Sequence, residues 1–268
     1  MAHILYQVDA FADRLFAGNP AGVMILDAFL PDETLQALAA ENNLAETAYA
    51  VRRGPGAYDL RWFTPGTEVP LCGHATLAAA HVLWTEEGED ADALTFDTLS
   101  GLLTVTRRAD GYAMDFPADP PERIDAPDGL AEALGVVPEA VLAGQYLLAV
   151  LPDETSVREL APNLLALEGV RVPRGRGDAE DCVCVTAPGD RHDFVSRFFG
   201  PTVGITEDPV TGSAHCMLTP YWAARLGKTN LSAFQASPRG GAVGCMLHGD
   251  RVELRGQAVT YMRAALRL

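Results

Sequence analysis

One eight-residue pattern occurs twice in this sequence, once in each half of the chain. Residues 68–75 read E-V-P-L-C-G-H-A, and residues 207–214 read E-D-P-V-T-G-S-A. The two segments lie 139 residues apart in a chain of 268, and they are identical at four of their eight positions. An aromatic residue and a proline precede both copies, at 63–65 and 199–201, and an apolar run follows both. A pattern repeated at half the chain length predicts an internal duplication of one structural unit.

The first turn of the helix that follows each copy is a candidate anion-binding site. A helix start leaves backbone N–H groups without partners, and the aligned peptide dipoles make this end positive. Gly73 and Gly212 have no side chain to block a ligand, so a carboxylate could bind at both starts. An ordinary strand–turn–helix junction is the alternative interpretation. The polar residues His74 and Ser213 at matching positions favour the binding site, with both starts directed at one cleft.

Composition excludes several classes of function. The net charge is −16, so the chain would repel the phosphates of nucleic acids. No apolar run approaches the roughly 18 residues that cross a membrane, and the first residues lack the pattern of a signal peptide. The five cysteines are an odd number, which favours reduced thiols and a cytoplasmic location. Cys182 and Cys184 lie close together, but no spaced set of Cys and His residues accompanies them, and we expect no metal site.

The duplication and the hydrophobic patterns predict an α+β fold with two domains. The first domain spans 1–117 and is completed by a C-terminal strand near 259–268, and the second spans 128–258. A proline-rich linker is expected between them. Many short strands and one long helix per half are typical of a mostly antiparallel sheet wrapped around a central helix, and not of a doubly wound sheet.

The two central helices are predicted over 73–85 and 213–226. The first is apolar on nearly every side, so neighbouring elements must surround it. The second carries Pro220 in its interior, where the missing N–H should kink or split the helix. A single strand is expected over 141–150. The three arginines of the loop 171–177 could bind an anion, although a solvated loop is the favoured interpretation.

Glu46 is a candidate general acid/base. It falls in a strand predicted over 44–51, on the face that also carries the methyl groups of Ala48 and Ala50. A solvated glutamate on an edge strand is the alternative interpretation. A carboxyl group on a wall of small side chains has the room, and the raised pKa, that acid/base catalysis uses.

Four motifs together resemble those of the PhzF family, the phenazine-biosynthesis isomerases and their relatives. They are F-A-G-N-P-A at 16–21, N-L-A-E-T-A-Y at 43–49, F-T-P-G-T-E-V-P-L-C-G-H-A-T at 63–76 and E-D-P-V-T-G-S-A-H at 207–215. The resemblance implies a diaminopimelate epimerase-like fold, with two pseudo-symmetric halves and the site between them. It also implies a homodimer that moves a proton within a small carboxylate-bearing metabolite, without cofactor or metal. Phenazine synthesis itself is not implied, because the motifs specify chemistry more than substrate.

The resemblance also implies roles for particular residues. Glu46 corresponds to the acid/base, and His74 and Asp208 line the cleft beside it. Ser213 and the backbone amides of two glycines at the helix starts, Gly73 and Gly212, would hold the carboxylate of the substrate.

Cys72 raises a second hypothesis. Epimerases with this fold use two cysteines, one at each helix start, and Cys72 stands at the first of these positions. Thr211 stands at the second, and its hydroxyl is far too weak an acid to exchange protons as a thiol does. A two-thiol racemase is therefore unsupported, and packing is the favoured role of Cys72. We count both residues among the substrate-binding positions, and a one-cysteine epimerase or a catalytically silent binding protein stays open as an alternative.

Overall fold

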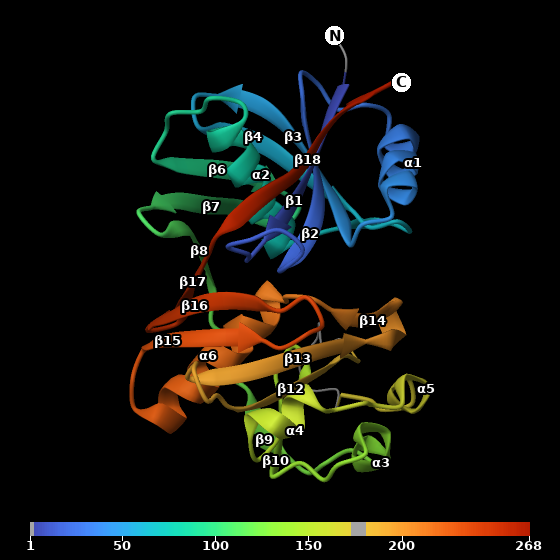
Figure 1. Ribbon diagram of the computed structural model, residues 1–268, viewed down its shortest axis with the longest axis vertical. Helices are drawn as coiled ribbons and strands as arrows, with labels where there is room; N and C mark the ends of the chain where they lie inside the picture. The colour runs from blue at the N-terminus through green and yellow to red at the C-terminus, as the bar shows by residue number, and fades with distance from the viewer. Residues whose placement is uncertain (1–2, 173–180) are drawn as a thin grey trace. The chain divides into compact units, whose positions relative to one another are not determined.

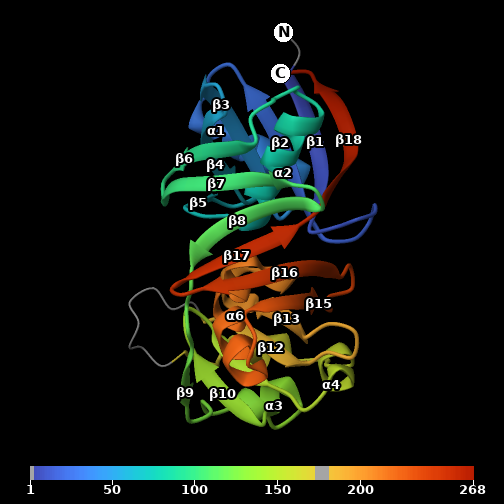
Figure 2. The ribbon, with the colours of Figure 1, turned by 90° about the vertical axis from the view of Figure 1, so that its left-hand side faces the viewer.

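The computed structural model describes residues 3–172 and 181–268 (Figure 1). The chain forms two compact units: unit 1 comprises Met1–Asp115 with Arg255–Leu268, and unit 2 comprises Phe116–Leu254. Each unit combines a central helix with many strands, which confirms the expected α+β class (Figures 1 and 2). Arg174 and Arg176 of the arginine-containing loop lie outside the described residues.

Unit 1 is a mostly antiparallel sheet that packs on one central helix. Its strands are β1 (His3–Ala10), β2 (Asn19–Leu26), β3 (Glu46–Gly54), β4 (Ala57–Phe63), β5 (Glu68–Val69), β6 (Ala93–Thr98), β7 (Gly101–Arg108), β8 (Gly111–Pro117) and β18 (Ala258–Leu266). Its helices are α1 (Asp32–Asn42) and α2 (Gly73–Thr85). The pairs β2–β3 and β4–β6 are parallel because α1 and α2 connect them as crossovers.

Helix α2 begins and ends where the sequence predicts. Every residue from 74 to 84 is buried, and the helix packs against β1, β2, β3 and β18. Its run of alanines lets these strands approach closely on several sides. The helix is therefore apolar on every side because neighbouring strands surround it, as expected from the sequence.

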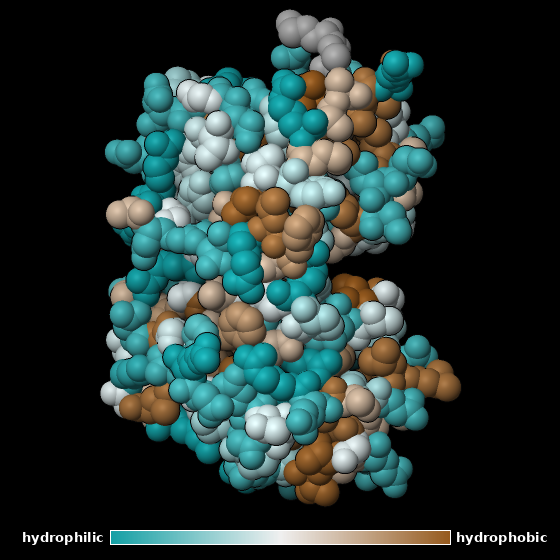
Figure 3. Space-filling view, in the orientation of Figure 1, coloured by the Kyte–Doolittle hydropathy of each residue, from teal (hydrophilic) through white to brown (hydrophobic). Residues whose placement is uncertain are grey.

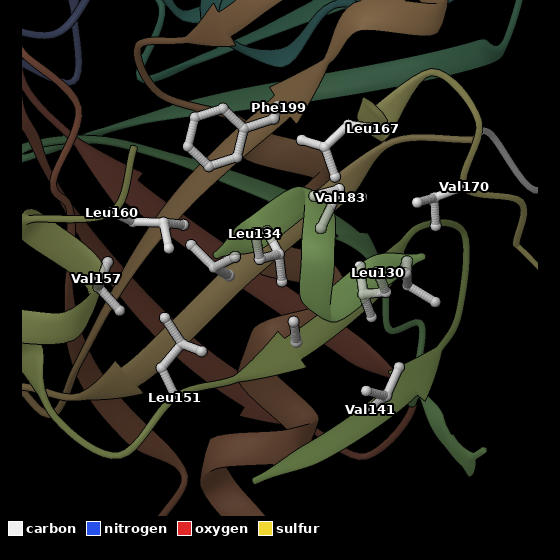
Figure 4. Packing of buried hydrophobic residues seen from close by; sticks show 14 of the residues in the cluster. Leu130, Leu134, Val141, Leu151, Val157, Leu160, Leu167, Val170, Val183 and Phe199 are labelled. Carbon is white, nitrogen blue, oxygen red and sulfur yellow. The ribbon is translucent and has the colours of Figure 1, made fainter. Parts of the chain in front are cut away.

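Unit 2 has its own strands, helices and core. The strands are β9 (Glu122–Ile124), β10 (Ala140–Ala143), β11 (Leu147–Val150), β12 (Val183–Pro188), β13 (Phe194–Gly200), β14 (Ile205–Asp208), β15 (Asn230–Gln235), β16 (Gly241–His248) and β17 (Arg251–Gly256). The helical segments are α3 (Leu130–Leu134), α4 (Glu154–Arg158), α5 (Leu164–Leu167), the 3₁₀ turn η1 (Pro201–Val203) and α6 (Gly212–Leu226). Leucine, valine and phenylalanine side chains from several of these elements form one cluster (Figure 4). Hydrophilic residues predominate on the face of each unit that Figure 3 shows.

The two units repeat one pattern of strand pairing. In unit 1, β4 pairs with β3 and β5 antiparallel and with β6 parallel. In unit 2, β13 pairs with β12 and β14 antiparallel and with β15 parallel. The central helix follows the short strand in both units, as α2 follows β5 and α6 follows β14. The shared topology supports the duplication that the sequence pattern indicates.

Of the two outcomes expected at Pro220, a kinked or a split helix, the split does not occur in α6. The helix is continuous from Gly212 to Leu226. A proline leaves the carbonyl four residues earlier without its helical donor, and here that carbonyl belongs to Cys216. The backbone N–H of Asp119 donates to Cys216 O at 3.0 Å. The preceding chain thus supplies the hydrogen bond that Pro220 removes.

The stretch 141–150 is also different from its prediction. It forms the hairpin β10–β11 and not one strand, with a turn at residues 144–146. Gln145 N donates to Asp119 Oδ2 at 2.6 Å, and a Cβ on Gly144 would lie 2.4 Å from the same oxygen. Since the run is apolar on both sides of the turn, its hydrophobic pattern gave little sign of a break. In the stretch expected to be a linker, residues 122–124 form β9 and pair with β10.

Candidate active site

Both central helices begin without a side-chain cap. The residue before α2 is Cys72, and the residue before α6 is Thr211, and both have extended backbones (φ −147° and −109°). Neither side chain makes a capping hydrogen bond within the part of the chain that the structure describes. Because N-cap side chains normally satisfy some of the first N–H groups, a helix start without such a cap can offer donors to a ligand.

Glu46 and His74 form a buried charge pair in unit 1. Glu46 is the first residue of β3, and its Oε2 lies 3.1 Å from His74 Nε2. The side chains of Glu46 and His74 are only 14% and 7% exposed. The two atoms are at ion-pair distance but are not aligned as a hydrogen bond, so charge is the main attraction between them. The structure thus brings together two residues that the sequence analysis singled out separately.

Cys72 and Asn19 contact the other nitrogen of the His74 ring. Cys72 Sγ lies 3.5 Å from Nδ1, and Asn19 Nδ2 lies 3.3 Å from it. Asn19 is fully buried at the first residue of β2. Its amide offers a donor or, when turned over, an acceptor, so it can pair with either protonation state of His74. The sequence analysis assigned Asn19 no role, although the residue lies within the motif at 16–21.

Burial and charge together set the pKa values of this group. Burial raises the pKa of Glu46, but the charge of His74 and the polar contacts of His74 and Cys72 together outweigh it, and the net pKa is lowered. The raised pKa expected for Glu46 is therefore wrong, because the sequence did not show the partner. Burial lowers the pKa of His74, whereas Cys72 and Glu46 raise it well above its usual value. Burial, reinforced by Glu46, raises the pKa of Cys72 to about 11.

These directions define the charges at neutral pH. Glu46 is ionised, His74 is protonated, and the thiol of Cys72 is neutral. Glu46 is consequently the charged partner of His74, and Cys72 adds a second contact to the ring. An ionised carboxylate is ready to accept a proton from a substrate, and a protonated imidazole beside it can stabilise negative charge that develops there.

Glu46, Cys72 and His74 also carry metal-ligating atoms, which lie within 4.8 Å of one another. The thiol approaches Nδ1 of the imidazole, however, and the carboxylate approaches Nε2. The sulfur and the carboxylate therefore approach the ring from different nitrogens.

In unit 2, Asp208 and Thr211 are tied together at the start of α6. Thr211 Oγ1 donates to Asp208 Oδ2 at 2.5 Å. The fully buried Gln235 joins them, since its Oε1 accepts from Thr211 N at 2.9 Å and its Nε2 donates to Asp208 O at 2.8 Å. The sequence analysis missed Gln235, which lies in β15, 24 residues after Thr211. The bonds fix the segment that leads into the helix.

Ser213 has a partner that the sequence analysis also missed. Its Oγ lies 2.8 Å from the hydroxyl of Tyr146, which comes from the turn before β11. The ring of Tyr146 packs edge-on against Phe198, with ring centres 4.8 Å apart. A rigid ring therefore orients the Ser213 hydroxyl at the first turn of α6.

Comparison with known proteins identifies relatives across the whole chain. A family model described as phenazine biosynthesis-like protein matches residues 8–264. An uncharacterized isomerase of Pseudomonas aeruginosa is 53% identical over 98% of both chains. An uncharacterized isomerase of Halalkalibacterium halodurans is 44% identical, and a human phenazine biosynthesis-like domain-containing protein is 38% identical, each over 98% of both chains.

Solved structures show the same likeness. The crystal structure of a PhzF-family phenazine biosynthesis protein from Enterococcus faecalis gives a TM-score of 0.95 at 44% identity, covering 100% of both chains. A hydroxyproline epimerase from Agrobacterium vitis gives a TM-score of 0.61 at 13% identity, covering 99% of this chain and 94% of that one. The second likeness concerns the fold alone, and together they confirm the expected diaminopimelate epimerase-like fold. Among the described residues, no helix combines the length and apolar character that a membrane crossing requires.

Proposed function

Because the chain belongs to the phenazine biosynthesis-like family of isomerases, we propose that it moves a proton within a small carboxylate-bearing metabolite. Glu46 is the acid/base in this proposal. The observation that supports it most directly is the 3.1 Å contact between the carboxylate of Glu46 and the imidazole of His74. The contact keeps the carboxylate ionised despite its burial, as a base must be.

The proposed reaction needs only one carboxyl group to carry the proton. Glu46 removes a proton from one carbon of the substrate. The electron pair of that C–H bond forms a new double bond, and the π pair of the neighbouring double bond moves to its far carbon. The carboxyl group then returns the proton to another carbon, and Glu46 is ionised again. Substrate and product have the same oxidation state, so the step is balanced without a cofactor. Protonated His74 stabilises the negative charge that develops between the two transfers.

We assign the carboxylate of the substrate to the amides of Gly73 and Gly212 and to the hydroxyl of Ser213. The uncapped helix starts support this role, because their N–H groups and dipoles favour an anion. Cys72 and Thr211 would border the bound group, since each directly precedes a helix start. Asp208 would assist proton transfer. This part of the proposal rests on the duplicated sequence and on the local geometry of each helix start.

The test is a screen of small unsaturated carboxylic acids in D2O, with NMR detection of deuterium at carbon. The wild-type protein should exchange or isomerise its substrate, and Glu46→Gln should reduce the rate by at least about 10²-fold. Glu33→Gln is the matched control, because Glu33 is an exposed glutamate of the same unit. Equal rates for wild type and Glu46→Gln on a true substrate would reject the role of Glu46.

A one-cysteine epimerase is the second candidate, and the 3.5 Å contact of Cys72 Sγ with His74 Nδ1 is the observation in its favour. The raised pKa of the thiol argues against it, because the thiolate is the reactive form. Deuterium exchange at the α-carbon of an amino acid that Cys72→Ser abolishes and Glu46→Gln does not would establish this alternative. A ligand that stabilises the protein but is never converted would instead support a silent binding protein.

We further propose a cytoplasmic homodimer. All five cysteines are buried and outside disulfide bonds, as a reducing compartment permits. Light scattering should give a mass near twice the 28.6 kDa of one chain. A mass of one chain at micromolar concentration would contradict the dimer.

A further inference from the structure

Two ion pairs of the same geometry lie just ahead of the two central helices, and we call each an Arg–Glu fork. In unit 1, Arg61 donates from Nε to Glu68 Oε1 at 2.7 Å and from Nη2 to Oε2 at 2.8 Å. In unit 2, Arg197 donates from Nε to Glu207 Oε1 at 2.7 Å and from Nη2 to Oε2 at 2.9 Å. A bidentate pair of this kind fixes orientation as well as distance.

The forks occupy equivalent places in the duplicated unit. Each arginine lies two residues before an aromatic ring and stacks over it, 5.1 Å from the centre of Phe63 and 5.0 Å from that of Phe199. Each glutamate lies five residues before the first residue of its helix, Gly73 or Gly212. The connecting turn is three residues longer in unit 2, and the 3₁₀ turn at Pro201–Val203 has this length. The same device thus occurs twice despite a turn of different length.

Each fork is partly buried and has a third anchor. Arg61 Nη1 donates to Asp32 at the start of α1 at 2.8 Å, and Arg197 Nη1 donates to the carbonyls of Val157 and Leu160 at 3.1 and 2.6 Å. The two arginine side chains are 22% and 10% exposed. Exposed single-contact ion pairs contribute little, whereas several hydrogen bonds on one half-buried guanidinium restrict its position strongly.

We propose that the two forks are positioning devices that fix the first turns of α2 and α6, and thereby place His74 and Ser213. This inference deepens the proposed function and rests on it. Strand β5, which carries Glu68, has only two residues, so backbone pairing alone holds it weakly. Strand β14, which carries Glu207, pairs with β13 across an irregular register. In both units the fork ties the segment that enters the helix to the long strand before it.

The test uses the backbone amides of Gly73 and Gly212 as NMR reporters of the two helix starts. Glu68→Gln removes the charge of the unit 1 fork at nearly constant shape, and it should shift the amide signal of Gly73 and leave that of Gly212 in place. Glu207→Gln should do the reverse. This crosswise pattern distinguishes local positioning from a general loss of stability, which would affect both reporters alike.

Matched controls come from ion pairs away from the helix starts. Glu89 pairs with Arg52 in unit 1, and Glu154 pairs with Arg158 in unit 2. Glu89→Gln and Glu154→Gln should lower the melting temperature and leave both glycine reporters unchanged. If the fork variants also lower the melting temperature without moving their reporters, the forks are only stabilising and the proposal is wrong.

More conservative variants keep the proposal testable if the glutamine variants do not fold. Arg61→Lys and Arg197→Lys keep the charge but lose the second arm of each fork, and we expect them to move the same reporters by a smaller amount. With a substrate in hand, loss of the unit 1 fork should lower kcat by about 10²-fold, because it displaces His74. Loss of the unit 2 fork should mainly raise KM, because it displaces Ser213.

The reporters also separate this inference from the proposed function. The signals of Gly73 and Gly212 respond to the fork variants whether or not Glu46 transfers a proton. If the glycine signals shift in the fork variants but Glu46→Gln keeps full activity, the positioning role of the forks stands and the proposed reaction is rejected. If the glycine signals do not shift and Glu46→Gln is inactive, only the positioning role of the forks is rejected.

Discussion

Glu46 Oε2 lies 3.1 Å from His74 Nε2, so a strand and a helix each supply one half of a buried charge pair. Neither charge would be stable at this depth without the other, because burial opposes both ionised forms. Removing either partner therefore changes the protonation of the one that is left. This dependence gives the site several measurable properties.

The charge pair predicts a pH window for its contribution to stability. The pKa of Glu46 is lowered in the folded state, so its contribution is complete above the ordinary value of 4.5 and is lost as pH falls through the folded value. The pKa of His74 is raised, so its contribution is complete below 6.5 and is lost as pH rises through the folded value. The free energy of unfolding in urea should be measured for wild type and for Glu46→Gln. The difference between them should be largest at a pH between the ordinary pKa values of the two groups. A difference that does not vary with pH would contradict the pair.

Glu46→Gln should also change the titration of His74. Burial lowers the pKa of the imidazole, Cys72 and the Glu46 carboxylate raise it, and the variant loses the contribution of the carboxylate. The NMR titration of His74 should move to a lower pH in the variant than in wild type. Glu33→Gln should leave it unchanged. An unaltered titration in Glu46→Gln would show that another group charges His74.

Asn19 should orient the imidazole ring of His74 from the edge opposite Glu46. Asn19→Leu removes the amide that lies 3.3 Å from His74 Nδ1, and we expect isomerase activity to fall by about tenfold or more as the ring loses its orientation. Asn19→Asp places an anion there and should raise the pKa of His74 further. Kinetics and NMR titration measure the two effects separately. Activity of Asn19→Leu equal to wild type would exclude an orienting role.

Gln235 should be a stabilising residue of the second helix start. Gln235→Ala leaves the N–H of Thr211 without its acceptor and should lower the free energy of unfolding by about 1–3 kcal/mol. Gln235→Glu can still accept from Thr211 N, but it places a buried carboxylate against Asp208 O, so a loss at least as large is expected. Urea unfolding of the three proteins at neutral pH tests this order. The reverse order would refute the assigned hydrogen bonds.

Pro220→Ala should have a small effect on stability. A proline inside a helix usually costs about 3 kcal/mol, in part because one carbonyl loses its donor. Here Asp119 N already donates to that carbonyl, on Cys216, at 3.0 Å. The variant should therefore gain less than about 1 kcal/mol in thermal or urea unfolding. A gain near the full 3 kcal/mol would mean that Asp119 does not compensate for the proline.

The elements with strong local signals are the ones that the sequence predicted well. Helix α2 follows a turn at Gly73 and continues as an uninterrupted apolar run, and its bounds agree with the structure. The α+β class followed from the two long helices among many short strands. The hairpin at residues 144–146 and the continuous helix through Pro220 were not predicted, because Asp119 contributes to both from a distant part of the chain.

The chemistry of the site was less predictable than its location. Glu46 and His74 were both candidates, but their proximity depends on how β3 pairs and where α2 packs, and the direction of the Glu46 pKa depends on that proximity. The two Arg–Glu forks were not predicted from the sequence, for a simpler reason. The arginine precedes its glutamate by 7 residues in unit 1 and by 10 in unit 2, so an alignment without gaps matches the glutamates only.

The matching strand registers also align the sequences of the two copies. Thr47 pairs with Phe63 in unit 1 as Val183 pairs with Phe199 in unit 2, so Cys182 is the counterpart of Glu46. A complex of two identical single-copy chains would have to carry the same residues at both helix starts. Fusion of the copies into one polypeptide lifts this restriction, and each copy is then free to diverge. At the corresponding positions the first copy carries Glu46 and His74, and the second carries Cys182 and Ser213.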